Sequence, residues 1–280
     1  MGDKQRGSAV LVMTDVHYGK RTSTYSPGRC ARRLDVLGRE LGRIRGLLAG
    51  YEFEELVIAC LGDVNDGTDI YATQPHHQAI TNVEQQAEEV ARLFYAFSVA
   101  QADVWGRVRW ECVPGNHGRA GKRAAEAANW DMVAYRYLSL MNQDGRVAVN
   151  LPDRNADPFL RVMRVYRHGY LIYHGHDIRA WGNIPWYGIM LRLLRWQAAR
   201  GDFHGWQTVL MGHFHTIGLW RFNGMVAMCS GTMVTDDEWG LRSFGLQPMN
   251  QWWFFGVSPG QPLTWQFCLD VGHGHDRENV

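Results

Sequence analysis

Carboxylate, amide and imidazole side chains recur in short segments along this chain, and all of these side chains can bind metal ions. The segments are Asp15-Val16-His17, Gly62-Asp63 with Asp66, Gly115-Asn116-His117, His174-Gly175-His176 and Gly212-His213-Phe214-His215. Oxygen and imidazole ligands of this kind suit divalent ions such as Mn²⁺, Fe²⁺ and Zn²⁺.

A short apolar run stands before each of these segments. The runs cover residues 10–13, 56–61, 110–113, 170–173 and 209–211. Short apolar runs that end at Gly or Pro are typical of buried strands. Because open α/β sheets bind their ligands at the carboxyl ends of the strands, we expect the metal-binding side chains to meet at one sheet edge.

The elements between these runs predict the fold class. A leucine-rich stripe over 34–48 and three segments over 80–102, 124–141 and 186–199 predict helices, whereas short strands are expected over 208–211, 217–222, 225–228, 252–257 and 263–267. Alternation of strands and helices favours a partly parallel sheet, and the later strands favour a second, largely antiparallel sheet. We therefore predict an α/β fold, a four-layer α-β-β-α sandwich with two mixed central sheets flanked by helices.

The length of the chain fits one large core. We predict one domain over residues 1–280, in which the motifs lie between residues 15 and 215. The strands over 217–268 are expected to complete the second sheet, and residues 271–280 to form a tail. Residues 152–158, which are rich in Pro, Asp and Asn, are expected to form a surface loop.

Composition bears on the partners of this protein and on the compartment in which it acts. With 29 Lys and Arg against 28 Asp and Glu, any contact with nucleic acid must come from a local patch. Five scattered Cys without a Cys-x-x-Cys pair indicate a reducing compartment and argue against a zinc–thiolate site. The polar start does not resemble a signal peptide and no apolar run reaches membrane-spanning length, so we predict a cytoplasmic protein without membrane contact. Twelve Trp and the apolar residues 252–257 are compatible with a homodimer.

Each motif residue also has an ordinary structural interpretation. Asp15 could cap a turn after its strand, and Asp63 could shape a turn with Gly62. His213 and His215 could be surface histidines that alternate on an extended segment. Unrelated turns would have to reproduce all five segments in order, so the metal interpretation is favoured for the set.

The five motifs in this order resemble the calcineurin-like metallophosphoesterases, whose pattern is Asp-x-His, Gly-Asp-x-x-Asp, Gly-Asn-His, His and Gly-His-x-His. The resemblance spans residues 15–215 and implies two divalent ions, with Mn²⁺ as the first choice and Fe²⁺, Zn²⁺ or Ni²⁺ as the others. It implies that one ion is held by Asp15, His17 and His215, the other by Asn116, His174 and His213, with Asp63 bridging the two ions.

The resemblance gives His117 a different task. In the family this histidine is not a ligand but stabilises the transition state beside the substrate and can protonate the leaving oxygen. Asp66 is then expected to orient His117. Between His174 and His176, the family pattern favours His174 as the ligand, because the family's ligand directly precedes a Gly. His176 is left as a neighbouring or surface residue, or one that contacts substrate.

The substrate is less well marked by the sequence. The Ser/Thr protein phosphatases of the superfamily have an Arg after the second Asp, where this chain has Gly67, and the Mre-type nucleases have an Asp where it has Gly118. Basic residues near the motifs would attract a polyanion, although a solvated helix start explains them as well. The candidate substrate-binding residues are Arg119, Arg179, His76 and His77. The other basic residues near the motifs are Lys20, Arg21, Lys122 and Arg123. Three aromatic residues could stack on bases: Trp181, Trp186 and Tyr187.

We therefore predict a binuclear metal-dependent phosphodiesterase that hydrolyses nucleic-acid or nucleotide phosphodiester bonds through a hydroxide held between the ions. The expected partner is a phosphodiester substrate, DNA or RNA. A phosphomonoesterase acting on proteins or small molecules is the first alternative. A non-enzymatic binding scaffold with the same fold is the second, and it is disfavoured because every ligand type is retained.

Overall fold

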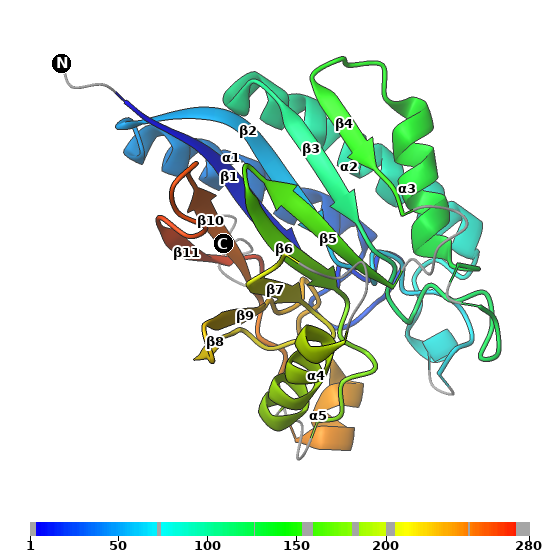
Figure 1. Cartoon of the computed structure of the whole chain (residues 1–280). Helices are drawn as coiled ribbons and strands as arrows, with labels where there is room; N and C mark the ends of the chain where they lie inside the picture. Colours follow the sequence, from blue (N-terminus) through cyan, green and yellow to red (C-terminus); the bar gives the residue numbers. More distant parts are fainter. Residues whose placement is uncertain are drawn as a thin grey trace.

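The computed structural model of the protein describes residues 4–71, 74–125, 127–152, 159–180, 185–199, 205–245 and 247–272. Two mixed sheets lie at the centre of the molecule, and helices cover their outer faces (Figure 1). This is the α/β sandwich with two mixed sheets that the alternation of strands and helices predicts.

Six strands form the first sheet, in the order β11-β10-β1-β2-β3-β4. Its parallel part contains β1 (Gln5–Met13), β2 (Tyr51–Cys60), β3 (Val108–Cys112) and β4 (Val147–Asn150). Its antiparallel part contains β10 (Gln251–Val257) and β11 (Gln266–Asp270). The carboxyl ends of β1, β2 and β3 therefore meet at one edge, as expected for parallel neighbours.

Five strands form the second sheet, in the order β5-β6-β7-β9-β8. They are β5 (Leu160–Val165), β6 (His168–Tyr173), β7 (Thr208–Met211), β8 (Gly218–Phe222) and β9 (Met225–Cys229). The central strands β6, β7 and β9 are parallel, and β5 and β8 pair antiparallel at the two edges. The sheet is mixed, so the expectation of a largely antiparallel second sheet was wrong.

The expectation that all strands over 217–268 complete the second sheet was also wrong. Only β8 and β9 join it, whereas β10 pairs with β1 of the first sheet through partners such as Ser8 and Val257. The physical reason is that β10 is apolar on both faces. Trp252 and Phe254 pack with the helix-facing core, and Phe255 packs between the two sheets. An interior strand of the first sheet buries both faces in this way.

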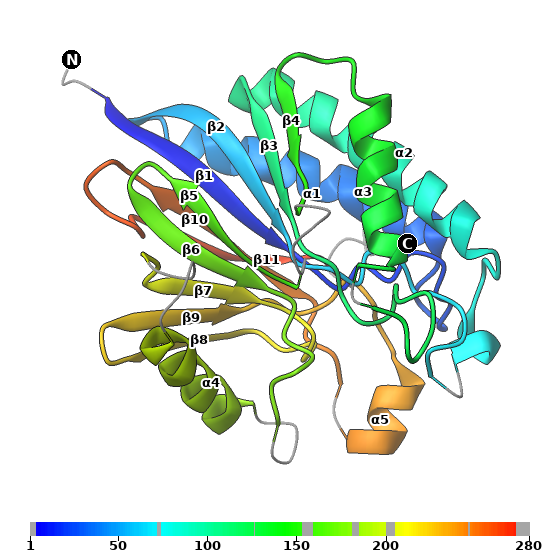
Figure 2. The ribbon, with the colours of Figure 1, turned by 45° about the vertical axis from the view of Figure 1, so that its right-hand side comes forward.

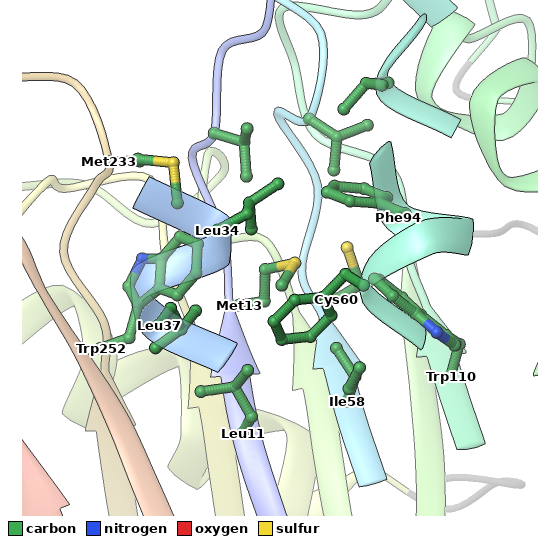
Figure 3. Close-up of a cluster of buried hydrophobic side chains, with 14 of the residues drawn as sticks. Leu11, Met13, Leu34, Leu37, Ile58, Cys60, Phe94, Trp110, Met233 and Trp252 are labelled. Atoms are coloured by element: carbon green, nitrogen blue, oxygen red, sulfur yellow. The ribbon is translucent and has the colours of Figure 1, made fainter. Parts of the chain in front are cut away.

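Helices α1 (Pro27–Leu47), α2 (Val83–Trp105) and α3 (Trp130–Met141) cover the first sheet, and α4 (Trp186–Ala198) packs against the second (Figure 2). Figure 3 shows Leu37 of α1 near Leu11 of β1 and Trp252 of β10 in the buried cluster under the helices. A separate cluster that includes Val10 and Ile172 fills the space between the sheets. The four layers are thus helices, sheet, sheet and helix.

Several helices and strands begin or end at residues other than those predicted from the sequence. The helix expected from residue 124 begins at Trp130, because the Asn129 side chain accepts a hydrogen bond from Asp131 N and caps it. The helix expected from residue 80 begins at Val83, where Asn82 is the cap. The strand expected over 263–267 covers Gln266–Asp270 instead. The short helices η1 (Gln74–His77) and α5 (Glu238–Phe244) complete the elements of the described residues.

Residues 153–158 of the expected surface loop and residues 273–280 of the expected tail lie outside the described residues. In the part of the chain that the structure describes, none of the helices combines the length and the apolar character that a membrane span requires.

Candidate metal centre

The five sequence motifs lie at the carboxyl ends of strands from both sheets. Asp15 and His17 follow β1, Asp63 and Asp66 follow β2, and Asn116 and His117 follow β3. His174 follows β6, and His213 and His215 follow β7. Because the two sheets pack face to face, the loops after these strands converge on one region. Side chains up to 200 positions apart, such as Asp15 and His215, are therefore in contact.

The first cluster contains Asp15, His17 and His215, whose ligand atoms all lie within 4.8 Å of one another. Asp15 Oδ1 is 3.2 Å from His215 Nε2 and 3.7 Å from His17 Nε2, and these two nitrogens are 3.2 Å apart. The other carboxylate oxygen of Asp15 accepts hydrogen bonds from Thr14 Oγ1 at 2.6 Å and from His213 N at 2.9 Å. One carboxylate oxygen and two imidazole nitrogens thus point at a common position, which suits a divalent cation.

The second cluster contains Asp63, His174 and His213, again with ligand atoms within 4.8 Å of one another. His174 Nε2 lies 3.1 Å from Asp63 Oδ2 and 2.9 Å from Asn116 Oδ1, and His174 Nδ1 lies 2.7 Å from the Leu61 carbonyl. A carbonyl only accepts, so Nδ1 carries the hydrogen and Nε2 faces two oxygens with a lone pair. Electron pairs that converge in this way need a proton or a cation between them, and these residues could therefore hold a metal ion.

Burial and neighbouring charges shift the pKa values of the carboxylates and imidazoles in the two clusters. Although burial alone would raise it, hydrogen bonds with His17 and His215 lower the pKa of Asp15. Burial alone would lower the pKa of both His17 and His174. Asp15 and Asp66 outweigh burial at His17 and raise its pKa to about 10. Asp63 outweighs burial at His174 and raises its pKa to about 9. These imidazoles hold protons that a bound cation would replace, so metal binding would release protons and weaken in acid.

The backbone of the site is constrained in a way that supports the side-chain geometry. Asp15, His17, Asp63, His213 and His215 all have positive φ, between 48° and 70°. Non-glycine residues rarely adopt this left-handed region, and such residues cluster at functional sites where the surrounding structure enforces them. Five of the seven expected ligands share this conformation, which turns their side chains out of tight loops.

The tight loops also depend on glycine. Gly62 has a φ of 90°, and a Cβ there would collide with the backbone of Pro114 and Gly115. A Cβ on Gly115 would in turn collide with the Asp63 side chain and backbone. The loop after β2 and the loop after β3 therefore touch each other directly, and this contact brings Asp63 beside Asn116.

His117 lies beside the first cluster and forms a third group with His17 and Asp66, whose ligand atoms also lie within 4.8 Å of one another. Its ring is 4.5 Å from the ring of His17 and is partly exposed, whereas His17 is fully buried. Burial, with a contribution from His17, lowers the pKa of His117 to about 4, so this imidazole is neutral at pH 7. A neutral imidazole at the edge of the site can donate or accept a hydrogen bond to substrate.

The Asp66 carboxylate lies near two imidazole rings, those of His117 and His17. Its carboxylate oxygen Oδ1 is 3.8 Å from His117 Nδ1, beyond hydrogen-bond distance, and 3.5 Å from His17 Nδ1. The contact of Asp66 with His117 at hydrogen-bond distance comes from its backbone carbonyl, at 3.2 Å from Nδ1. The carboxylate thus lies closer to His17, which is the more buried of the two rings.

Sequence reasoning missed Asp131, a buried residue in the first turn of α3. Its carboxylate accepts hydrogen bonds from Asp63 N at 2.8 Å, Asn65 N at 3.1 Å and Gly115 N at 2.9 Å. Asp131 thereby joins the loops that follow β2 and β3. The only sequence signal was an acidic residue directly after a helix cap, which is a common arrangement without functional meaning.

The expected substrate residues lie at different places. Arg119 is half-buried, and its Nε donates to the Asn116 carbonyl at 3.1 Å. His76 and His77 belong to η1, whose first residue, Gln74, contacts His117. Arg179 is exposed in the loop before α4.

The remaining candidates contribute less to the site. Lys122 and Arg123 are exposed, and Trp181 lies outside the described residues. Trp186 and Tyr187 begin α4, with their rings 5.0 Å apart. The ring of His176 is 5.7 Å from that of His174 and 6.3 Å from that of His213, so His176 is a neighbour of the second cluster.

No protein-family model matches this chain. No curated protein matches it either. Among solved structures it is similar to a conserved protein of Streptococcus pneumoniae described as a predicted phosphoesterase, with 10% identity, a TM-score of 0.38 and coverage of 94% of this chain and 98% of that chain. It is also similar to a novel archaeal phosphodiesterase, with 11% identity, a TM-score of 0.42 and coverage of 93% and 99%. A third similar structure is Vps29 complexed with zinc from Entamoeba histolytica, with 12% identity, a TM-score of 0.36 and coverage of 94% and 99%.

The resemblance to the calcineurin-like metallophosphoesterases lies in the order of the five motifs. Identities and TM-scores at this level do not transfer an activity or a metal from those proteins to this one. The assignment of function therefore depends on the residues of the two clusters, and not on what the similar proteins do.

Proposed function

We propose that this protein is a binuclear metal-dependent phosphodiesterase that acts on nucleic-acid or nucleotide phosphodiester bonds. The observation that carries the proposal is the pair of buried donor clusters, Asp15 with His17 and His215, and Asp63 with His174 and His213. Two neighbouring groups of oxygen and imidazole donors at the carboxyl ends of strands are the arrangement that phosphoryl transfer with two metal ions requires.

The residues divide between the two ions according to their contacts. Asp15, His17 and His215 would hold one ion, and Asn116, His174 and His213 would hold the other. Asp63 would contribute to both sites, since it touches His174 in the second cluster and its charge also raises the pKa of His17 in the first. Divalent ions bound there supply Lewis acidity and an activated water molecule, and the mixture of carboxylate, amide and imidazole donors favours Mn²⁺.

The protein residues around the ions have separate tasks. The ring of His117 lies against His17 at the edge of the first cluster, where it can donate a hydrogen bond to the leaving oxygen. Arg119 is next to Asn116 and can pair with a phosphate oxygen. His76, His77 and Arg179 are proposed to contact the substrate farther from the reacting phosphorus.

Two features favour a diester over a monoester. The position after Asp66, where the protein phosphatases of the superfamily have Arg, is Gly67, and a side chain there would collide with the His117 carbonyl. A dianionic monoester therefore lacks its expected partner, and a diester carries only one negative charge. Arg119 and Arg179 follow the motif loops, so a polyanionic chain would meet positive charge around the site.

The proposal is tested by cleavage of end-labelled single-stranded and double-stranded DNA in the presence of Mn²⁺, with the Asp63→Asn variant as the control for contaminating nucleases. Product from the wild type that is absent with the variant supports a nuclease, and the product ladder separates exonuclease from endonuclease attack. Turnover of a phosphomonoester in preference to the matching diester would overturn the proposal. So would the absence of hydrolysis of either by protein that contains two metal ions, which is the outcome expected of a binding scaffold.

A further inference from the structure

Gln74 is a buried residue beside the candidate site whose role the sequence did not indicate. It begins η1, is 6% exposed and lies 3.3 Å from His117 Nδ1 through its Nε2 atom. Burial of an amide side chain requires partners for both its oxygen and its nitrogen. The identity of those partners fixes which way the amide points.

The oxygen end of the Gln74 amide is fixed by the backbone. Oε1 accepts hydrogen bonds from Ile70 N at 2.8 Å and from Tyr71 N at 3.1 Å. Only the oxygen of the amide can meet two N–H groups, because the nitrogen is a donor itself. A flipped amide would set two donors against two donors, so Nε2 must face the other way.

The nitrogen end of the amide faces Asp66 and His117. Nε2 donates to the Asp66 carbonyl, and it also lies 3.3 Å from His117 Nδ1, within reach of its second hydrogen. A donor at this position favours a lone pair on Nδ1, and the hydrogen of the neutral ring is then on Nε2. Two groups of Asp66 favour the opposite tautomer: its carboxylate, which is 3.8 Å from Nδ1 and makes no hydrogen bond with it, and its carbonyl, which is 3.2 Å from Nδ1. That carbonyl already accepts the hydrogen bond from Gln74 Nε2, and a hydrogen on Nδ1 would face the second Gln74 amide hydrogen, because the two nitrogens are 3.3 Å apart.

We propose that Gln74 is a positioning residue that fixes the tautomer and the orientation of His117, so that Nε2–H is presented to a phosphate ester oxygen. Tyr71 supports the same ring: its own ring lies 4.8 Å from His117 and its hydroxyl accepts a hydrogen bond from Asn116 Nδ2 at 2.7 Å. Gln74 holds the backbone of Tyr71, so one amide orders both the ring of His117 and the residue packed on it. The catalytic consequence rests on the proposed function, whereas the tautomer itself does not.

The tautomer can be measured directly. We expect protein labelled with ¹⁵N-histidine and dialysed against diamagnetic Zn²⁺ to show His117 with hydrogen on Nε2 in long-range ¹H–¹⁵N correlation spectra. The signal is assigned by its loss in His117→Ala. In Gln74→Glu, which places an acceptor where Nε2 was, we expect the hydrogen to move to Nδ1. Hydrogen on Nδ1 in the wild type, or an unchanged tautomer in Gln74→Glu, would overturn the proposal.

Kinetics test the consequence for the reaction. Gln74→Met keeps the length of the side chain but removes the donor, and we expect kcat to fall by about 10-fold or more on a diester with an alkyl leaving group while KM changes little. The fall is expected to be smaller on bis-p-nitrophenyl phosphate, whose leaving group needs little stabilisation. Gln85→Met is the matched control, because Gln85 is an exposed helix residue bonded to Glu89.

Different outcomes of these experiments refute the positioning role of Gln74 and the proposed function. Equal losses of kcat on both diesters, or a change confined to KM, would show that Gln74 only maintains the fold and would overturn its role in positioning. Absence of diesterase activity in the wild type would instead refute the proposed function, and the tautomer of His117 would then still decide what Gln74 does.

Discussion

Asp63 Oδ2 lies 3.1 Å from His174 Nε2, although Asp63 follows β2 of the first sheet and His174 follows β6 of the second. Neither sheet contains the candidate centre alone. An ion bound between these residues would hold the two layers together at their common edge, so metal affinity and the packing of the sheets are expected to depend on each other.

The first prediction concerns Asp63. In Asp63→Asn the side chain keeps its shape but loses the negative charge that offsets two neighbouring dications, so we expect the content of both metal ions to fall. Elemental analysis after dialysis against Mn²⁺ measures this content. Asp69→Asn is the matched control, because Asp69 is exposed and belongs to the same loop region. Normal occupancy in Asp63→Asn would argue against a bridging carboxylate.

The second prediction separates His117 from the ligands. We expect His117→Ala to retain the metal content of the wild type and to lose about 10²-fold or more in kcat, because a hydrogen-bond donor to the leaving oxygen is removed without a metal ligand. His168→Ala is the control, since that ring binds the Ser258 carbonyl. Loss of metal from His117→Ala would show that His117 is a ligand.

The third prediction concerns Asp131, which joins the loops after β2 and β3. Asp131→Ala leaves the backbone N–H groups of Asp63, Asn65 and Gly115 without this acceptor. We expect the free energy of unfolding to fall by about 3 kcal/mol and metal affinity to fall by about 10-fold or more. Urea unfolding and metal titration measure the two effects.

The control for Asp131 is Asp103→Ala, because Asp103 is an exposed residue that pairs with Arg146. We expect this variant to stay within about 0.5 kcal/mol of the wild type. An Asp131→Ala variant with the stability and metal affinity of the wild type would remove Asp131 from the site.

The fourth prediction uses the buried pair of Lys20 and Asp237, whose Nζ and Oδ2 atoms are 2.9 Å apart. Burial raises the pKa of Asp237, but Lys20 outweighs burial and lowers it to about 2. The folded pKa is below the unfolded value of about 3.9, so the pair stabilises the fold at neutral pH and this stability is lost as the pH falls from about 5 to about 2.

We therefore expect the difference in unfolding free energy between wild type and Asp237→Asn to shrink by on the order of 2 kcal/mol over that range of pH. Denaturant unfolding at a series of pH values measures the difference. Lys20→Met is expected to flatten the same dependence, since it removes the cation. An Asp237→Asn variant that loses stability in acid as steeply as the wild type would contradict the prediction.

The members of the two clusters and the strands before them were predictable without any three-dimensional information. Asp15, Asp63, Asn116, His174 and His213 each follow an apolar run, and both signals are local: residue type and the length of the run before it. Parallel strands then bring their carboxyl ends together without further information. The mixed two-sheet α/β fold was predictable for the same reason, because alternation of strand and helix is visible along the chain.

The sheet that the last strands join and the residues that support the site became known only from the packing of the folded chain. β10 and β11 extend the first sheet because β1 offers an edge and both faces of β10 are apolar, which periodicity cannot distinguish from a second-sheet strand. In the sequence, Asp131 is typical of the start of a helix, and Gln74 is typical of a turn. They act through partners distant in the chain, Gly115 and His117, and such contacts exist only after the sheets have packed.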